Sequence, residues 1–187
     1  MSSFIVLEAL DGVGKTTLAK NLSEHHSYKF LTTPGKELQP LRADIINGLG
    51  KSQTARALFY AATVQAEGER AASLCSQGQS VVMDRYSAST IAYAKARGVN
   101  TDLEAALSQA VKPDLTILLT LDEQERQQRL RQRGTTAEDL ETLQPVFRQQ
   151  VMAGLRQRCD IELDVSGLDQ QQALQELVAI IKSHCPT

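Results

Sequence analysis

The chain has 187 residues, a length that accommodates one well-buried α/β domain and is short for two. Its 20 lysines and arginines stand against 22 aspartates and glutamates, which gives a formal net charge of −2. This balance excludes a global electrostatic attraction to nucleic acid or to an anionic membrane, so any anion site must be local. We therefore expect a single domain over residues 1–187, with neither nucleic acid nor a membrane as partner.

The cysteines and the amino terminus bear on the compartment. Cys75, Cys159 and Cys185 are odd in number and lack metal-ligand spacing, a pattern typical of free thiols in a reducing compartment. The first residues lack the basic region and apolar core of a signal peptide, and no apolar run approaches membrane-spanning length. We expect a cytoplasmic protein.

Short apolar runs alternate with longer helical stretches along the chain, a rhythm typical of parallel sheets built from βαβ units. Runs rich in Val, Ile and Leu predict strands over residues 4–9, 28–32, 80–84, 114–121 and 161–165. Helices are predicted to begin near Lys15, Leu38, Gln53, Ser87, Thr101, Asp122, Leu140 and Leu168. Capping-box spacing occurs in the pairs Thr101 with Glu104, Thr136 with Asp139, and Ser166 with Asp169. The pattern predicts a three-layer α/β fold in which helices cover both faces of a parallel sheet of about five strands.

The strongest motif is Ala9-Leu10-Asp11-Gly12-Val13-Gly14-Lys15-Thr16-Thr17, which lies between the first predicted strand and an amphipathic helix. In this context glycines let backbone amides curl around phosphate oxygens, and the helix amino terminus adds partial positive charge. Lys15 would reach the β- and γ-phosphates of ATP, and the Thr16 hydroxyl would ligate Mg²⁺. Ala9 replaces the glycine that usually opens such a loop, a change that a negative φ tolerates. The motif predicts a P-loop NTPase fold with ATP and Mg²⁺ as cofactors and residues 11–17 as the ATP site; a chance glycine-rich turn is the alternative.

A second signal is SVVMDRY, a predicted strand that ends in Asp84-Arg85-Tyr86. Catalytic groups in open parallel sheets gather at the carboxyl ends of the strands. We expect Asp84 to hold Mg²⁺ through water and Arg85 to clamp a phosphate. A surface ion pair is the usual alternative for an Asp-Arg pair after a strand, but the P-loop favours the catalytic interpretation.

The segment ERQQRLRQRG, residues 125–134, is rich in arginine and glutamine. A solvated helix face is the usual interpretation of such a charged run. Arg126, Arg129 and Arg133 are spaced to share one helical face, so a cationic face beside the phosphate site is the other interpretation. Both interpretations remain open at this point.

Several motifs together resemble those of thymidylate kinases in order and approximate spacing. Besides the P-loop and the Asp84-Arg85-Tyr86 triplet they are Leu58-Phe59-Tyr60-Ala61-Ala62, Ala92-Tyr93, Lys112-Pro113-Asp114-Leu115 and Arg133-Gly134. The resemblance spans nearly the whole chain and identifies a divergent member of this nucleoside monophosphate kinase family. It implies ATP-dependent phosphorylation of a nucleoside monophosphate, dTMP to dTDP by default.

The resemblance also implies roles for matching residues. Asp11 would contact the sugar hydroxyl of the acceptor nucleotide and position its phosphate, while Arg85 would bridge the donor and acceptor phosphates. Phe59 would stack on thymine and Tyr93 would lie against deoxyribose, although a place in the helical core is the alternative for both rings. Residues 126–142 resemble a lid that closes over ATP, with Arg129 beside ATP and Arg133 in catalysis. The family's dimer implies a homodimer formed through helices after the second and third strands, where residues 55–72 are rich in alanine.

The chain also departs from the family at positions that bear on specificity and catalysis. Thr32 and Thr33 replace charged residues before Pro-Gly, and Thr63 and Ala94 replace polar contacts to the base. Val13 and Asp139 stand where family members carry a catalytic arginine, so Arg129, Arg131, Arg133 and Arg148 are candidates for a relocated one. These departures keep two alternatives open: a kinase for another nucleotide, nucleoside or small metabolite, and a catalytically weak ATP-binding switch.

Overall fold

The computed structural model describes residues 2–185 and contains one sheet of five parallel strands. The strands are β1 (Phe4–Glu8), β2 (Lys29–Thr32), β3 (Val81–Asp84), β4 (Leu115–Thr120) and β5 (Ile161–Asp164), in the spatial order β2-β3-β1-β4-β5. Each strand lies within its predicted run. The prediction of a five-stranded parallel sheet is therefore confirmed.

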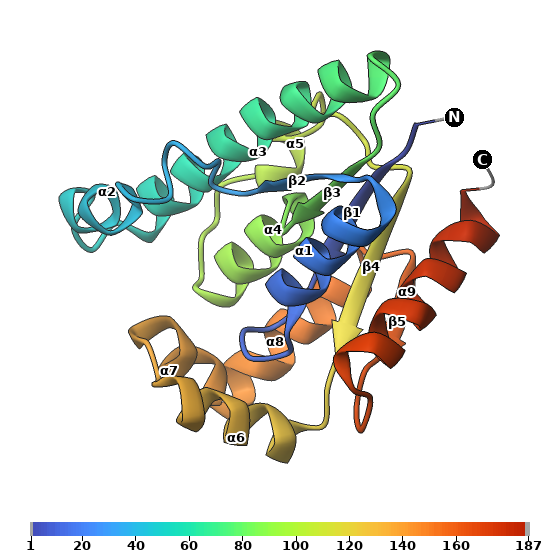
Figure 1. Cartoon of the computed structure of the whole chain (residues 1–187). Helices are drawn as coiled ribbons and strands as arrows, with labels where there is room; N and C mark the ends of the chain where they lie inside the picture. Colours follow the sequence, from blue (N-terminus) through green and yellow to red (C-terminus); the bar gives the residue numbers. More distant parts are fainter. Residues whose placement is uncertain (1, 186–187) are drawn as a thin grey trace.

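Helices cover both faces of this sheet (Figure 1). On one face α1 packs against α9, and on the other α4 packs against α3 and α8. The helices are α1 (Lys15–His26), α2 (Arg42–Gly48), α3 (Gln53–Ser76), α4 (Ser87–Ala96), α5 (Leu103–Ala106), α6 (Glu123–Arg133), α7 (Ala137–Leu143), α8 (Pro145–Arg156) and α9 (Gln170–His184). This arrangement confirms the predicted three-layer α/β fold.

The central strand β1 is covered on both faces, which explains its unbroken apolar run from Phe4 to Leu7. Ile5 and Leu7 belong to the core cluster that includes α1 and α9, whereas Phe4 and Val6 belong to the cluster that includes α3. Because helices cover both faces, every residue of β1 is buried. The strand thus has no exposed face that would favour alternating polar residues.

Two predicted helix starts are wrong, and a proline accounts for each. The helix expected near Leu38 begins at Arg42, because Pro40 has no backbone N–H and disfavours helical geometry in the residue before it. The single helix expected from Leu140 is two helices, α7 and α8. Pro145 occupies the first turn of α8, where its fixed φ suits a new helix.

The predicted caps have a mixed outcome. The Thr136–Asp139 capping box is present at the start of α7. The other two predictions name the wrong capping residue. Asp102, not Thr101, caps α5 by accepting from the backbone N–H of Ala105, and Asp169, not Ser166, caps α9 in a capping box with Gln172. In both cases an aspartate nearer the helix supplies the acceptor that the predicted hydroxyl would have supplied.

The parallel register brings functional candidates to one edge of the sheet. Leu7 of β1 and Thr32 of β2 both pair with Asp84 of β3, so the P-loop after β1 and the loop after β2 flank the end of β3. Helices α6 and α7 lie at the same end of the sheet (Figure 1). Between residues 2 and 185, no helix combines the length and apolar character that crossing a membrane requires. The cysteines are free thiols, as predicted.

Candidate active site

The P-loop runs from the end of β1 into the first turn of α1. Gly12 and Gly14 have φ values of +90° and +104°, which L side chains rarely adopt. A Cβ at Gly12 would also stand 2.9 Å from the side chain of Leu130, so the loop can lie against α6 only with glycine there. Ala9 is fully buried, which places the methyl group that departs from the usual motif in the core.

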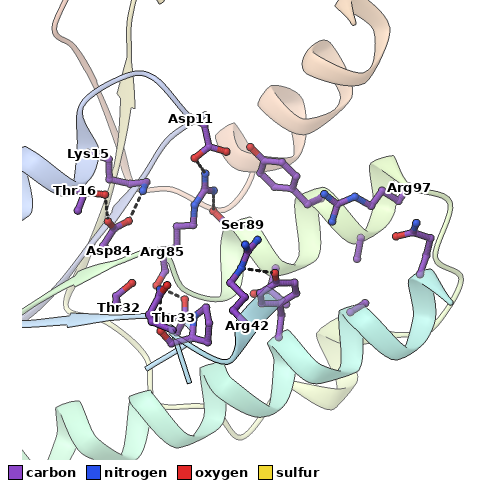
Figure 2. Close-up of a pocket in the computed structure, with 18 residues that line it drawn as sticks. Asp11, Lys15, Thr16, Thr32, Thr33, Arg42, Asp84, Arg85, Ser89 and Arg97 are labelled. Carbon is purple, nitrogen blue, oxygen red and sulfur yellow. Dashed lines mark hydrogen bonds and ion pairs between the residues drawn. The ribbon is translucent and has the colours of Figure 1, made fainter. Parts of the chain in front are cut away.

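Three side chains meet at the start of α1. Lys15 Nζ and Thr16 Oγ1 both donate to the carboxylate of Asp84 (Figure 2). Lys15 is 6% and Asp84 5% exposed. Burial opposes ionisation of Asp84, but the Lys15 ammonium outweighs it and lowers the pKa of the carboxyl. The predicted phosphate-binding lysine and the predicted Mg²⁺ residues therefore share one site.

Arg85 directly follows β3, and its guanidinium lies beside the P-loop residue Asp11. Its φ of 67° is in the left-handed region, which is strained for a residue with a side chain. Arg85 Nη2 donates to Asp11 Oδ1 at 2.7 Å, Nη1 donates to Ser89 Oγ at 2.9 Å, and the guanidinium lies 5.3 Å from the Tyr93 ring centroid. Such a planar, oriented cation is suited to binding phosphate oxygens.

Glu8 is a member of this site that the sequence analysis missed. The carboxylate is fully buried at the end of β1. It accepts hydrogen bonds from the backbone N–H groups of Tyr86 and Ser89, at 2.9 and 3.1 Å, and from the Ser89 hydroxyl. Glu8 therefore caps the start of α4 and orients the serine that holds Arg85. The signal available in the sequence was an acidic residue at the end of an otherwise apolar strand.

The P-loop and Arg85 groups form one end of a cavity of about 270 Å³ between the P-loop, the β2–α2 loop, α3 and α4 (Figure 2). Glu8 lies behind this lining. The cavity is open to solvent and carries both charged and apolar groups. The Tyr93 hydroxyl is buried and has no hydrogen-bond partner within residues 2–185. The lining residues are Asp11, Lys15, Thr16, Thr32, Thr33, Pro34, Gln39, Arg42, Gln53, Ala57, Tyr60, Asp84, Arg85, Ser89, Thr90, Tyr93, Ala94 and Arg97.

Comparisons with known proteins agree with this geometry. The family model described as "Thymidylate kinase" matches residues 7–178. A probable thymidylate kinase of Pyrococcus horikoshii is 40% identical over 150 residues, covering 72% of this chain and 73% of that protein. A probable thymidylate kinase of Thermococcus kodakarensis is 35% identical over 152 residues, covering 72% and 74%.

This chain belongs to the thymidylate kinase family.

A solved structure of thymidylate kinase from Candida albicans superimposes with a TM-score of 0.79 at 28% sequence identity, covering 97% of this chain and 92% of that one. The thymidylate kinase structure from Ehrlichia chaffeensis, 20% identical, supports the fold with a TM-score of 0.69 over 96% of this chain and 98% of that one. The resemblance and the P-loop NTPase fold expected from the motifs are thus confirmed. The family is one of nucleoside monophosphate kinases, which use ATP as phosphate donor.

Within this thymidylate kinase family member, the structure does not place Phe59 in the cavity. Gln53, Ala57 and Tyr60 line it, because positions four and seven residues apart share one face of a helix. Phe59 is one residue, or about 100°, out of phase with that face, and its ring packs 5.2 Å from the Tyr60 ring. Thr63 is also absent from the lining; it is buried, and its hydroxyl donates to the Tyr60 carbonyl.

Two arginines of the cavity wall had no counterpart in the sequence analysis. Arg42, at the start of α2, donates from Nε to the Tyr60 hydroxyl at 2.9 Å. Arg97, at the end of α4, lies 5.5 Å from the Tyr93 ring centroid and pairs with Glu141 of α7. Neither has a local sequence motif, since each reaches the cavity only through tertiary packing.

The arginines of α6 do not form one cationic face. Arg126 is 1% exposed, because it pairs with Glu123 and donates to the Asp11 carbonyl and to Thr142. Neither interpretation of this segment holds for Arg126, because its guanidinium is buried and donates to acceptors within the protein. Arg129 donates to the Val13 carbonyl at 2.9 Å, and Arg133 pairs with Asp139 at 2.7 Å.

The Asp11–Arg85 pair should make stability depend on pH. Burial favours the neutral carboxyl, but Arg85 and Lys15 outweigh it and lower the pKa of Asp11 to about 2. A lowered pKa gives stability that is full above the ordinary aspartate value and lost as the pH falls toward 2. Asp11→Asn should therefore cost about 2 kcal/mol at pH 7 and about half of that at pH 3. Urea unfolding of both proteins at both pH values measures this difference, and an equal cost at each pH would contradict it.

Proposed function

We propose that this protein transfers the γ-phosphoryl group of ATP to dTMP, producing dTDP and ADP. The observation that carries the proposal is the cavity itself, which joins the P-loop lysine and the Asp84 carboxylate to a second phosphate-binding group, Arg85. A simple ATP-binding switch needs the first of these groups but not the second. An acceptor that already carries phosphate matches this pair of sites.

The donor end fits Mg-ATP by the chemistry of its groups. We propose that residues 11–17 bind the ATP phosphates, that Arg129 lies beside the nucleotide, and that Thr16 and Asp84 hold Mg²⁺. A hydroxyl and a carboxylate on adjacent elements suit a hard cation that otherwise binds water and phosphate. The metal would offset charge on the transferring group.

At the acceptor end, Arg85 and Asp11 have complementary roles in the proposal. Arg85 would clamp the dTMP phosphate against the γ-phosphate, and Asp11 would hold Arg85 and meet the sugar. The unpaired Tyr93 hydroxyl would donate to the acceptor. This hydroxyl is protonated at neutral pH and can donate, and burial raises its pKa still further, to about 12. We propose Tyr60, not Phe59, as the ring of α3 that contacts the acceptor.

We propose Arg133 as the relocated catalytic arginine, carried by a lid of residues 126–142. Its charge is the smallest of the influences that lower the pKa of Asp11, a P-loop residue. Arg126, Arg129 and Arg148 donate to backbone carbonyls and pair with glutamates. Among the side chains that the structure describes, Arg133 pairs with Asp139, and its own side chain is 50% exposed.

Substitution of Arg133 should therefore affect turnover more than ATP binding. Arg133→Met should lower kcat about 100-fold while the KM for ATP changes less than about threefold. Steady-state kinetics with saturating dTMP measure both. A loss no larger than that of Arg131→Met, two residues away on the same helix, would show that another group supplies the charge.

For the assembly, we propose one domain per chain and a homodimer formed through helices that follow β2 and β3, with residues 55–72 of α3 in the interface. Leu41, just before α2, and Leu58 of α3 are 51% and 45% exposed, and a second chain packed against them would bury both side chains. Sedimentation velocity tests this, with a monomer as the contradicting result. The expected cytoplasmic location stays a proposal.

The direct test of the function is ADP formation from Mg-ATP across a panel of nucleoside monophosphates, nucleosides and water. dTMP should give the highest kcat/KM. A higher value for another nucleotide or for a nucleoside would keep the kinase and replace its acceptor. ATP binding without turnover on any acceptor would contradict the proposal and favour the switch.

A further inference from the structure

Arg97 connects the cavity to a helix outside it. Its guanidinium lies against the Tyr93 ring and makes a two-point pair with Glu141 of α7, with Nη2–Oε2 at 2.5 Å and Nε–Oε1 at 3.2 Å. Figure 2 shows Arg97 across the cavity from Lys15. The ten residues of α4 separate Arg97 from Arg85, so the two arginines mark opposite ends of the wall that α4 contributes.

Helix α7 is held to its neighbours by charged and polar groups along its length. Asp139 is fully buried and accepts from Arg133 Nη2 at 2.7 Å. Thr142, also fully buried, accepts from Arg126 at 3.2 Å through its hydroxyl. Glu141 lies between these positions and faces Arg97. One seven-residue helix therefore joins the acceptor cavity to Arg133 and to the arginine that binds the Asp11 carbonyl.

We propose that Arg97 and Glu141 are positioning residues that couple acceptor binding to Arg133. An acceptor packed against Tyr93 and Arg97 would fix the Arg97–Glu141 pair, and α7 would transmit that position to Asp139 and Arg133. This inference rests on the proposed function. It explains how a chain with Val13 in the P-loop still brings an arginine to the phosphates when the acceptor is present.

The proposed coupling predicts that loss of the Arg97–Glu141 pair slows phosphoryl transfer to dTMP more than hydrolysis of ATP. In transfer, a phosphate oxygen of dTMP forms a bond to the γ-phosphorus, the bond to the β–γ bridging oxygen breaks, and ADP leaves. In hydrolysis, a water oxygen makes the same attack, giving inorganic phosphate and a proton. When the acceptor no longer positions Arg133, transfer to dTMP slows. Attack by water does not slow, because it takes place without an acceptor to position Arg133. The ratio of phosphate release to dTDP formation should therefore rise.

The experiment uses Arg97→Met, Glu141→Gln and the double variant of the full chain, with ATP and dTMP as substrates. Each single variant should lower kcat for dTDP formation about 10- to 100-fold, a loss expected from a misplaced catalytic group, with the KM for ATP within about twofold. The double variant should fall no further than the single ones, because both remove the same pair. Inorganic phosphate is measured in the same reactions.

A matched control pair lies elsewhere in the chain. Arg156 and Glu162 also form a two-point pair, with both N–O distances 2.9 Å, outside the residues assigned here to the reaction. Arg156→Met and Glu162→Gln should leave kcat and the phosphate-to-dTDP ratio unchanged. Unchanged kcat in Arg97→Met and Glu141→Gln, or losses that add in the double variant, would overturn the inference. Absence of dTDP formation by the unaltered protein would overturn the proposed function itself.

Discussion

Lys15→Met should reduce phosphoryl transfer to dTMP at least about 1,000-fold, because the transferring phosphoryl group then loses the positive charge of the P-loop lysine. Lys15 is buried at the start of α1 and contacts Asp84, so no other lysine can take its place without a rearrangement of the loop. Initial-rate kinetics at saturating ATP and dTMP give the loss in kcat. Calorimetric titration with Mg-ATP gives the accompanying loss in affinity.

The matched control for this prediction is Lys20→Met. Lys20 lies on the same helix but is exposed, so its substitution should leave turnover unchanged. Because Lys15→Met leaves the buried Asp84 carboxylate without its cation, the unfolding midpoint of each variant must also be measured. A folded Lys15→Met protein that keeps more than about a tenth of the normal turnover would contradict the assignment of Lys15 to the transferring phosphate.

Arg85→Met should have an effect of similar size but a different signature. The guanidinium is held by Asp11 and Ser89 and opens into the cavity, where it would align the acceptor with the donor. We expect kcat to fall about 1,000-fold and the KM for dTMP to rise, with the KM for ATP little changed. Kinetics with each substrate varied in turn separate the three quantities.

Arg85→Lys tests whether geometry or charge matters at this position. Lysine keeps the charge but cannot contact Asp11, Ser89 and a phosphate at the same time, so it should recover only part of the lost turnover. Full activity in Arg85→Lys would mean that the position supplies charge alone. Loss of ATP affinity without loss of kcat would place Arg85 at the donor and not between the substrates.

The sheet and the P-loop could be predicted from the sequence because their signals are local. Strands covered on both faces favour apolar residues at most positions, so β1 and β4 stand out as mainly apolar runs, with Glu8, Thr116 and Thr120 as the polar exceptions. The P-loop needs Gly12 and Gly14 at fixed spacing, since their backbone conformations exclude other residues. Both requirements, buried strand positions and special backbone conformations, act on residues that are neighbours in the sequence and can therefore be recognised there.

The rest of the site depends on contacts between distant segments. Tyr60 lines the cavity and Phe59 does not, because the packing of α3 fixes which of its faces is turned toward the cavity. The sequence of α3 alone does not determine this orientation. Arg126, Arg129 and Arg133 are spaced alike along α6, so the sequence does not distinguish them. Arg126 is buried and Arg133 is half exposed because of the way α6 packs on the P-loop. Glu8 was hidden because its hydrogen-bond partners follow β3, far away in the chain.

The most direct measurement of the central claim is transfer of label from [γ-³²P]ATP to dTMP, with products separated and dTDP identified. We expect labelled dTDP that requires both Mg²⁺ and dTMP, and that disappears with Lys15→Met. Label recovered only as inorganic phosphate, or label in dTDP that survives Lys15→Met, would contradict it.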